Sequence, residues 1–183
     1  MNYIKASLWF ADAYRKFNRF EKFLEKDSKI LDIGVGPGTL SYLLKCKGFN
    51  ITSIDIQNLS LFKEIKTIIY DGKIMPFYDN SFDLGLISTV LHHTHDPEEI
   101  LKEGKRVSKR LIIIEDIYDN KFQKFMTCVI DSISNFQIFN HPHTNKTHSD
   151  WLSLFNKLNL KIIYWQIDRV MPFLRQATYI LEK

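Results

Sequence analysis

The chain has 183 residues, a formal net charge of +4 and 45% hydrophobic residues, which bounds what it can be. A chain of this length fits one domain and can bury about 70% of its unfolded surface, enough for a sheet covered by helices. No apolar stretch approaches the ~20 residues of a membrane span, and the start of the chain lacks the apolar core of a secretory signal. We therefore expect one domain over residues 1–183, without a membrane span.

The cysteines indicate the redox compartment of the protein, and the lysines bear on whether it binds nucleic acid. Cys46 and Cys128, the two cysteines, have neither an evident pairing nor the spacing of a metal site, which favours a reducing cytoplasm and roles as small core residues. The lysines are scattered along the chain, so a solvated surface explains the positive charge better than a nucleic-acid partner does.

In chain order, the first half of the sequence predicts a helix followed by three short strands. Residues 1–26 form a helical segment, because apolar residues from Leu8 to Leu24 recur at steps of three or four. Short apolar runs predict strands, and Gly48 ends the helix that separates the first two. The expected elements are a strand over 29–33, a helix over 39–47, a strand over 50–55, a short polar helix or turn over 58–66 and a strand over 67–70.

The second half continues the alternation of strands and helices. The run over 82–88 is almost continuously apolar, as a strand buried on both faces should be. Asp96 and Pro97 mark the start of a helix, because Asp accepts free amide hydrogens and Pro suits the first turn. The remaining elements are helices up to 107, over 120–136 and over 148–158, and strands over 111–115, 161–166 and 178–181.

A glycine-rich corner is the most informative motif. Residues 29–38 read KILDIGVGPG, so a strand containing Asp32 runs into Gly34, Gly36 and Gly38, and a second apolar run ends on Asp55. Glycines at such a corner let the backbone approach a ligand, and an acid that closes the next strand can accept hydrogen bonds from a ribose diol. The pattern therefore predicts a site for an adenosine derivative.

Two other interpretations of the glycines remain open. A dinucleotide site has GxGxxG, but Thr39 stands where the third glycine would be, and no GKS or GKT of a phosphate loop is present. An ordinary tight turn in any α/β protein would also use glycines here.

Residues 71–101 carry a more specific likeness. They read DGKIMPFYDNSFDLGLISTVLHHTHDPEEIL, and with the glycine corner and Asp55 they resemble class I S-adenosylmethionine-dependent methyltransferases. The likeness is to the small ubiquinone and menaquinone biosynthesis type (methyltransferase type 11), and it covers residues 27–116. That family commonly has Lys-Pro-Gly-Gly before its fifth strand, whereas here Ser108-Lys109-Arg110 leads straight into Leu111.

The resemblance implies a fold and a set of cofactor contacts. The fold is an α/β, Rossmann-like, doubly wound sheet of seven strands, mostly parallel with an antiparallel last strand. By likeness to the family, Asp71 contacts the adenine amino group and the Gly72 amide contacts a ring nitrogen. Taken singly, Asp71-Gly72 could also be an ordinary turn, as could Asp55 before a loop. The other implied contacts are Asp55 to the ribose, Ile56 in the same cofactor site, Gly34, Gly36 and Gly38 beside the methionine moiety, Asp32 near its amino group, and Ser88 and Thr89 bordering the sulfonium.

The six histidines suggest either metal binding or catalysis. They form two groups, one at His92, His93 and His95 and the other from His141 to His148. We expect no metal, because His92 and His93 match the family's segment after its fourth strand and no set has closed ligand spacing. His93 or His92 is the candidate general base, since imidazole titrates near neutrality.

The sequence indicates the class of the methyl acceptor but not its identity. The chain lacks the [DNS]PP[YF] segment of amine methylation on bases, the cysteine nucleophile of pyrimidine C5 methylation and the cysteine set of arsenic methylation. Residues 117–150 are the expected substrate cover, and their aromatic and aliphatic residues favour a lipophilic or aromatic small molecule or, equally, plain helix packing. Those residues are Phe122, Phe125, Phe136, Ile138 and Phe139.

The function that follows is a cytoplasmic methyltransferase of the EC 2.1.1 class, which uses S-adenosylmethionine and releases S-adenosylhomocysteine. A non-catalytic module or partner subunit that binds either molecule is the alternative, and a nucleotide-dependent oxidoreductase is a distant third. Acceptor atom, oligomeric state and pathway are open.

Overall fold

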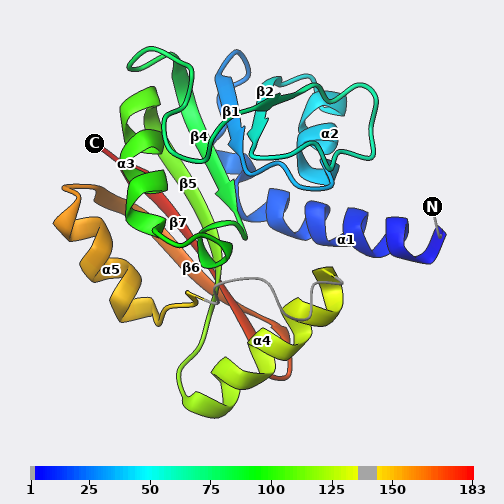
Figure 1. Ribbon diagram of the computed structural model, residues 1–183, viewed down its shortest axis with the longest axis vertical. Helices are drawn as coiled ribbons and strands as arrows, with labels where there is room; N and C mark the ends of the chain where they lie inside the picture. Colours follow the sequence, from blue (N-terminus) through cyan, green and yellow to red (C-terminus); the bar gives the residue numbers. More distant parts are fainter. Residues whose placement is uncertain (1–2, 136–143) are drawn as a thin grey trace. The chain divides into compact units, whose positions relative to one another are not determined.

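A computed structural model describes residues 3–135 and 144–183, and its elements follow the predicted α/β order (Figure 1). Among these residues the sheet has seven strands, in the order β3-β2-β1-β4-β5-β7-β6. The strands are β1 (Lys29–Ile33), β2 (Asn50–Asp55), β3 (Thr67–Ile69), β4 (Phe82–Ser88), β5 (Ser108–Ile117), β6 (Lys161–Met171) and β7 (Leu174–Glu182).

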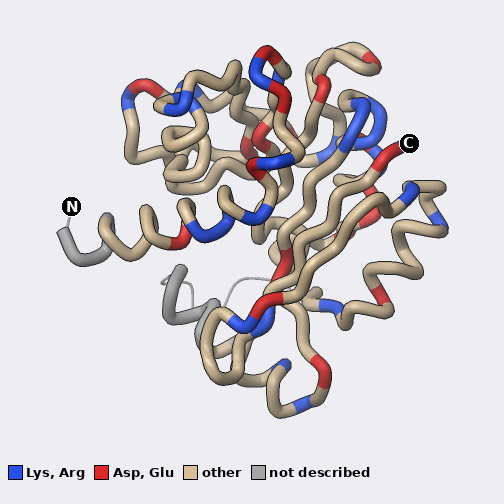
Figure 2. The backbone as a smooth tube through the Cα atoms, turned by 180° about the vertical axis from the view of Figure 1, so that it is seen from behind, with Lys and Arg blue, Asp and Glu red and all other residues tan. Residues whose placement is uncertain are grey.

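The helices precede, separate and follow these strands. They are α1 (Tyr3–Phe20), α2 (Thr39–Cys46), α3 (Pro97–Val107), α4 (Lys121–Asn135) and α5 (His148–Lys157), with short 3-10 helices η1 (Glu21–Phe23) and η2 (Leu91–His93). No helix in the described parts of the chain is long and apolar enough to cross a membrane. Lysines and arginines occur in short stretches separated by other residues along the backbone (Figure 2).

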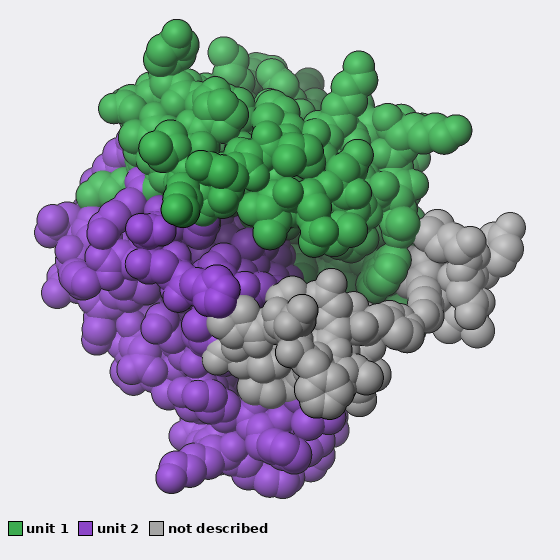
Figure 3. All heavy atoms as spheres, viewed as in Figure 1, with its two compact units in different colours: residues 1–86, 103–110 green, residues 87–102, 111–183 purple. Residues whose placement is uncertain are grey.

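Two compact units make up the chain (Figure 3): residues 1–86 with 103–110, and residues 87–102 with 111–183. In the first unit β1 pairs with β2, and β2 with β3, in parallel, so that Ile33 lies opposite Ile54 and Asp55 opposite Ile69. The ends of these three strands therefore lie along one edge, where the glycine corner begins. The expectation of a single domain over residues 1–183 stays a prediction.

The predicted N-terminal helix is confirmed, and its buried face is narrower than the apolar stripe. Ala13, Phe17 and Phe20 are buried, whereas Leu8 is exposed. The Phe17 and Phe20 rings meet edge to face with centroids 5.7 Å apart. Edge-to-face packing adds to the burial of the two rings, so the second half of the helix is the part that anchors it.

In the second unit, β6 and β7 form an antiparallel hairpin, which confirms the predicted antiparallel last strand. Both strands are longer than the apolar runs predict, because the pairing continues through Asp168–Gln176 to Met171–Leu174. Main-chain hydrogen bonds between antiparallel strands need no apolar side chains, so polar residues near the turn hide this extension from hydrophobic patterning. Helix α5 begins at a capping box made by Thr147 and Asp150.

Two expected boundaries are corrected, and one open alternative is decided. Of the helix or turn expected over residues 58–66 the structure has turns, because the Asn58 and Ser60 side chains accept hydrogen bonds from the amides of Ser60 and Phe62. Strand β3 ends one residue early, at Ile69. Strand β5 begins at Ser108, directly after α3, which agrees with the missing glycine turn at this point.

Candidate functional site

The loop between β1 and α2 has a conformation that needs glycine. Gly34, Gly36 and Gly38 have φ values of 78°, 51° and 79°, in the left-handed region that other residues rarely adopt. The Gly34 amide donates to the Ile54 carbonyl at 2.8 Å, which ties the start of the loop to the end of β2. The loop is therefore held at the edge where the parallel strands end.

Gly36 and Gly38 have different surroundings. A β-carbon on Gly38 would lie 2.7 Å from the Ser60 hydroxyl, so Gly38 is required by packing within the protein. Among the described residues, a β-carbon on Gly36 would have no non-neighbouring atom within 4 Å. The main chain at Gly36 is thus open to a ligand, as expected for a loop that a ligand approaches closely.

Asp55, at the end of β2, fixes both this loop and the chain that follows. Its Oδ2 accepts the Gly36 amide at 2.9 Å and its Oδ1 accepts the Ile56 amide at 2.7 Å. Oδ1 also accepts the Gln57 amide at 3.4 Å, which fills its two acceptor positions, whereas Oδ2 keeps capacity for a further donor. The structure brings Gly36 and Asp55 together as the sequence predicts.

Asp32 is a buried carboxyl beneath the same loop. It is 3% exposed, and its Oδ2 accepts a hydrogen bond of 2.6 Å from Ser41, whose hydroxyl also lies 2.8 Å from that of Ser53. Burial, opposed by the Ser41 bond and reinforced by the charge of Asp55, raises the pKa of Asp32 to about 6. A carboxylate in this position is stabilised by any added cation.

The end of β3 supplies the next predicted pair. The Oδ1 atom of Asp71 accepts the amides of Lys73 and Ile74 at 2.9 and 3.1 Å, and these bonds hold the pKa of Asp71 below its usual value. Gly72 has φ 78°, and a β-carbon there would lie 3.1 Å from the Ile56 side chain. Ile56 and Ile74, which follow the Asp55 and Asp71 carboxylates in sequence, are both exposed.

Ser88 and Thr89 lie at the end of β4, in the second unit. Thr89 has φ 56°, a strained conformation for a β-branched residue, and its amide donates to the Ile114 carbonyl at 2.7 Å. The Ser88 hydroxyl is buried, and within the described residues it has no hydrogen-bond partner. Backbone strain and an unsatisfied buried hydroxyl both occur often at ligand sites.

The structure separates the roles of the two candidate bases. His92 is fully buried, and its Nδ1 lies 2.6 Å from the Oε2 of Glu115, while Oε1 accepts the amides of Val90 and Leu91. His93 is only half-buried, and its ring centroid lies 4.0 Å from that of His92. His93 is thus the more accessible imidazole.

Glu115 was missed by the sequence interpretation, because the histidine segment and strand β5 are far apart in sequence. Its one signal was a charged residue within the apolar run LIIIEDI. A buried carboxylate needs partners, and here three donors supply them.

Part of the expected substrate cover lies beside the same histidines. The Thr144 amide donates to the His92 carbonyl at 3.0 Å, and its hydroxyl donates to the Leu91 carbonyl at 3.1 Å. Phe122 and Phe125 of α4 are exposed. Phe136, Ile138, Phe139, His141 and His143 lie outside the described residues.

His148 is the described histidine of the second group. The Nδ1 of His148 lies 2.9 Å from the Tyr179 hydroxyl, with the two rings stacked, and burial lowers the pKa of His148. In the part of the chain that the structure places, no three His, Cys, Asp or Glu residues gather in a way that could hold a metal ion.

Comparison with known proteins finds similarity to methyltransferases over about half of the chain. Residues 31–111 match the model of a family described as methyltransferase domain. An uncharacterized protein of Methanocaldococcus jannaschii is 39% identical over 85 residues, covering 44% of this chain and 39% of its own. The demethylmenaquinone methyltransferase of Thermotoga maritima is 34% identical over 98 residues, covering 48% and 43%. The chain therefore spans less than half the length of either relative.

A solved structure extends the likeness beyond the matched segment. A SAM-dependent methyltransferase of Methanosarcina mazei superposes with a TM-score of 0.71 at 20% identity, covering 90% of this chain and 96% of that one. At this identity the likeness shows the fold.

Proposed function

We propose that this chain, which belongs to the methyltransferase-domain family of class I S-adenosylmethionine-dependent methyltransferases, binds that cofactor and transfers its methyl group to a small acceptor. The observation that carries the proposal is the edge formed by β1, β2 and β3. There the open main chain at Gly36 is hydrogen-bonded to Asp55, and Ile56 contacts the Gly72 turn. S-adenosylhomocysteine is the product.

The residues of the first unit fit the chemical groups of the cofactor. The buried Asp32 carboxylate suits the methionine ammonium, because a cation offsets the cost of its burial. Asp55 has acceptor capacity at Oδ2 for a ribose hydroxyl, and Asp71 has its Oδ2 for the adenine amino group. The Gly72 amide suits a ring nitrogen, and the exposed Ile56 and Ile74 suit the faces of a flat aromatic ring.

At the reacting end, the proposal uses Ser88, Thr89 and the two histidines. When bound, S-adenosylmethionine supplies a methyl group activated by its sulfonium, so the protein has mainly to align the acceptor and exclude water. The Ser88 hydroxyl and Thr89 border that group. His93 takes the acceptor proton. The His92 ring, which Glu115 holds by a hydrogen bond, packs against the His93 ring and keeps it in place.

The acceptor that we propose is a small lipophilic or aromatic molecule. Phe122 and Phe125 lie in the segment over 117–150, whose residue Thr144 is hydrogen-bonded to η2. One relative is named a demethylmenaquinone methyltransferase, so demethylmenaquinone belongs in the acceptor panel. The dispersed lysines favour a small molecule over nucleic acid.

Calorimetric titration with S-adenosylmethionine, S-adenosylhomocysteine and NAD tests the proposal. Binding of the first two without NAD binding is the expected result, followed by cofactor-dependent product release with one member of a panel of quinones, phenols and amines. Preferential binding of NAD would contradict it. Cofactor binding without turnover of any acceptor would instead favour the non-catalytic binding module.

A further inference from the structure

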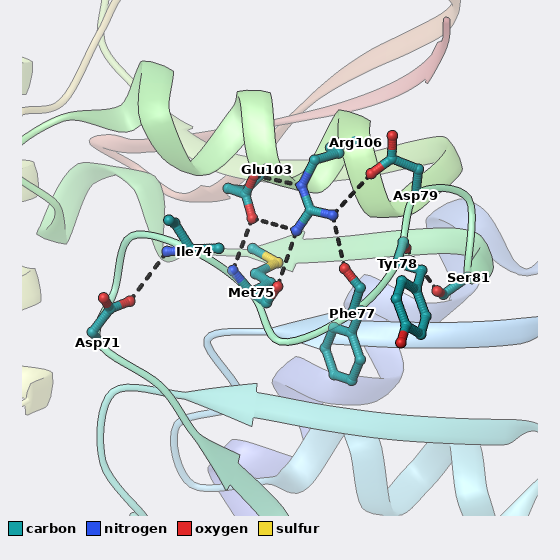
Figure 4. Close-up of polar contacts among 9 residues, drawn as sticks. All are labelled: Asp71, Ile74, Met75, Phe77, Tyr78, Asp79, Ser81, Glu103 and Arg106. Carbon is teal, nitrogen blue, oxygen red and sulfur yellow. Dashed lines mark hydrogen bonds and ion pairs between the residues drawn. The ribbon is translucent and has the colours of Figure 1, made fainter.

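Two side chains of α3, Glu103 and Arg106, form a two-pronged ion pair one helical turn apart (Figure 4). Arg106 Nε donates to Glu103 Oε1 at 2.7 Å, and Nη2 donates to Oε2 at 2.7 Å. The pair lowers the pKa of Glu103, chiefly through the Arg106 bonds. Such fork-to-fork pairing fixes the plane and direction of the guanidinium as well as its position.

The guanidinium also binds the main chain that follows Asp71. Nη2 donates to the Met75 carbonyl at 2.9 Å, and Nη1 donates to the Phe77 carbonyl at 2.7 Å and to Asp79 Oδ1 at 3.0 Å. With the two bonds to Glu103, these use all five N–H donors of an arginine side chain. Glu103 adds a contact of its own, because Oε2 accepts the Met75 amide at 2.8 Å.

These contacts begin one residue after the proposed adenine site ends. The amides of Lys73 and Ile74 donate to Asp71, and the next amide, of Met75, donates to Glu103. Met75 is buried, whereas Ile74 and Tyr78 on either side are 71% and 89% exposed. Met75 and the Phe77 ring, which packs edge to face on Phe82 with centroids 4.9 Å apart, anchor the loop by their side chains, and the polar contacts fix the main chain at the same two residues.

We propose that Glu103 and Arg106 are positioning residues for the adenosine half of the cofactor. They hold the main chain from Met75 to Asp79, and thereby keep the Asp71–Ile74 turn in the conformation that binds adenine. The inference rests on the proposed function, since it concerns that same site. Lysine cannot replace Arg106, because an ammonium lacks the planar fork that reaches Glu103 and two carbonyls together.

The central test is Arg106→Lys, with Arg110→Lys as the matched control. Arg110 lies in the same unit with a similar exposed fraction, 23% against 29%, and pairs with Glu25 instead of the 71–81 loop. The dissociation constants of S-adenosylhomocysteine and adenosine are measured well below the unfolding temperature. If the competent loop population falls to about a tenth, both constants rise about tenfold in Arg106→Lys. The control stays within twofold.

Hydrogen exchange and two further variants separate positioning from general destabilisation. In Arg106→Lys the Ile74 and Met75 amides should exchange faster, while the amides of β1 stay protected. Glu103→Gln keeps one acceptor oxygen and should have an intermediate effect. A Glu103→Gln/Arg106→Lys double variant should bind no more weakly than the worse single variant, because the two residues act as one unit.

The outcomes are distinct for the two proposals. A wild-type protein that binds neither ligand would overturn the proposed function, and the positioning role with it. Wild-type binding with unchanged affinity in a folded Arg106→Lys variant would overturn the positioning role alone. A loss of affinity equal in the Arg106 and Arg110 variants would also overturn it, because the effect would then be general.

Discussion

At the scale of single residues, Asp32 combines a charge with nearly complete burial. Ser41 donates a short hydrogen bond to it, Asp55 adds a second negative charge nearby, and the positive charge of Lys16 offsets the burial only in part. A residue chosen for stability alone would be neutral in this environment. The carboxylate is therefore best explained by a ligand cation, at a cost to the ligand-free protein.

The first prediction is that Asp32→Asn stabilises the ligand-free protein at pH 7 and weakens cofactor binding. The pKa of Asp32 is about 6 when folded against a model value of 3.8. Between these two values the folded protein binds a proton at Asp32 that the unfolded chain has released. The free energy of unfolding therefore falls as the pH rises from about 4 to above 6. A shift of this size corresponds to ~3 kcal/mol at most.

Chemical denaturation of both proteins at several pH values checks this sign. The advantage of Asp32→Asn should be present at pH 7 and above, should shrink as the pH falls below about 6, and should disappear at about pH 3, where the wild-type carboxyl is mostly protonated in both states. A variant that is less stable than wild type at pH 7 would contradict the burial argument. Titration with S-adenosylhomocysteine should show at least a tenfold loss of affinity.

The second prediction compares Gly36 with Gly48. Both have positive φ, and a β-carbon on either would meet no non-neighbouring atom of residues 3–135 and 144–183 within 4 Å. Replacement of either glycine by Ala should therefore cost a similar ~1 kcal/mol of stability from backbone strain. Only Gly36→Ala should reduce cofactor affinity, because only that β-carbon would meet the ligand.

Thermal denaturation and calorimetry in parallel measure the two quantities. Equal cofactor affinity in the two variants would mean that the loop at Gly36 faces away from the ligand. Gly38 is unsuitable for this comparison, because its β-carbon would displace Ser60 in the protein itself.

At the scale of elements, η2 is attached to β5 through one side chain. Glu115 accepts the Val90 and Leu91 amides at the start of η2 and contacts the His92 ring. A short 3-10 helix has little stability of its own, so its position follows from this carboxylate. The geometry of His93 depends on β5 in the same way, through His92.

The third prediction is that Glu115→Gln lowers the free energy of unfolding by about 2 kcal/mol. Glutamine has one acceptor oxygen, so at least one buried donor loses a charge-assisted partner. The control is Glu25→Gln, whose carboxylate is 78% exposed in its pair with Arg110 and should change stability by less than ~0.5 kcal/mol. Equal effects in the two variants would show that Glu115 has no special structural role.

At the scale of the whole molecule, the fourth prediction concerns residues 117–150. If this segment covers the acceptor, S-adenosylhomocysteine should slow amide exchange within it, because a closed cover excludes water. A variant lacking residues 138–143 should keep cofactor affinity within about twofold and lose at least tenfold in turnover of an identified acceptor. Exchange rates of α5, outside most of the segment, are the internal control.

Unchanged exchange over 117–150 together with full turnover by the shortened variant would contradict the cover. The segment would then be structural, and the aromatic residues of α4 would be explained by packing. Both measurements are needed, since slower exchange alone also follows from a general increase in stability.

Much of the fold and part of the site are local properties of the sequence. Strands β1, β2 and β4 have the bounds that their apolar runs predict, because an apolar run bounded by turn residues is a local signal. Glycines 34, 36 and 38 indicate left-handed backbone for the same local reason. The acids at the ends of β2 and β3 follow once the strands are known to be parallel.

Contacts between distant residues were decided only by the tertiary structure. The sequence does not reveal that Glu115 holds His92, or that Arg106 uses three of its five donors to hold a loop about thirty residues earlier and the other two to bind Glu103. It names two histidines as possible bases, and burial alone distinguishes them. Hydrophobic period and turn chemistry depend on neighbours along the chain, whereas hydrogen-bond partners, exposure and pKa depend on neighbours in space, which only the folded chain brings together.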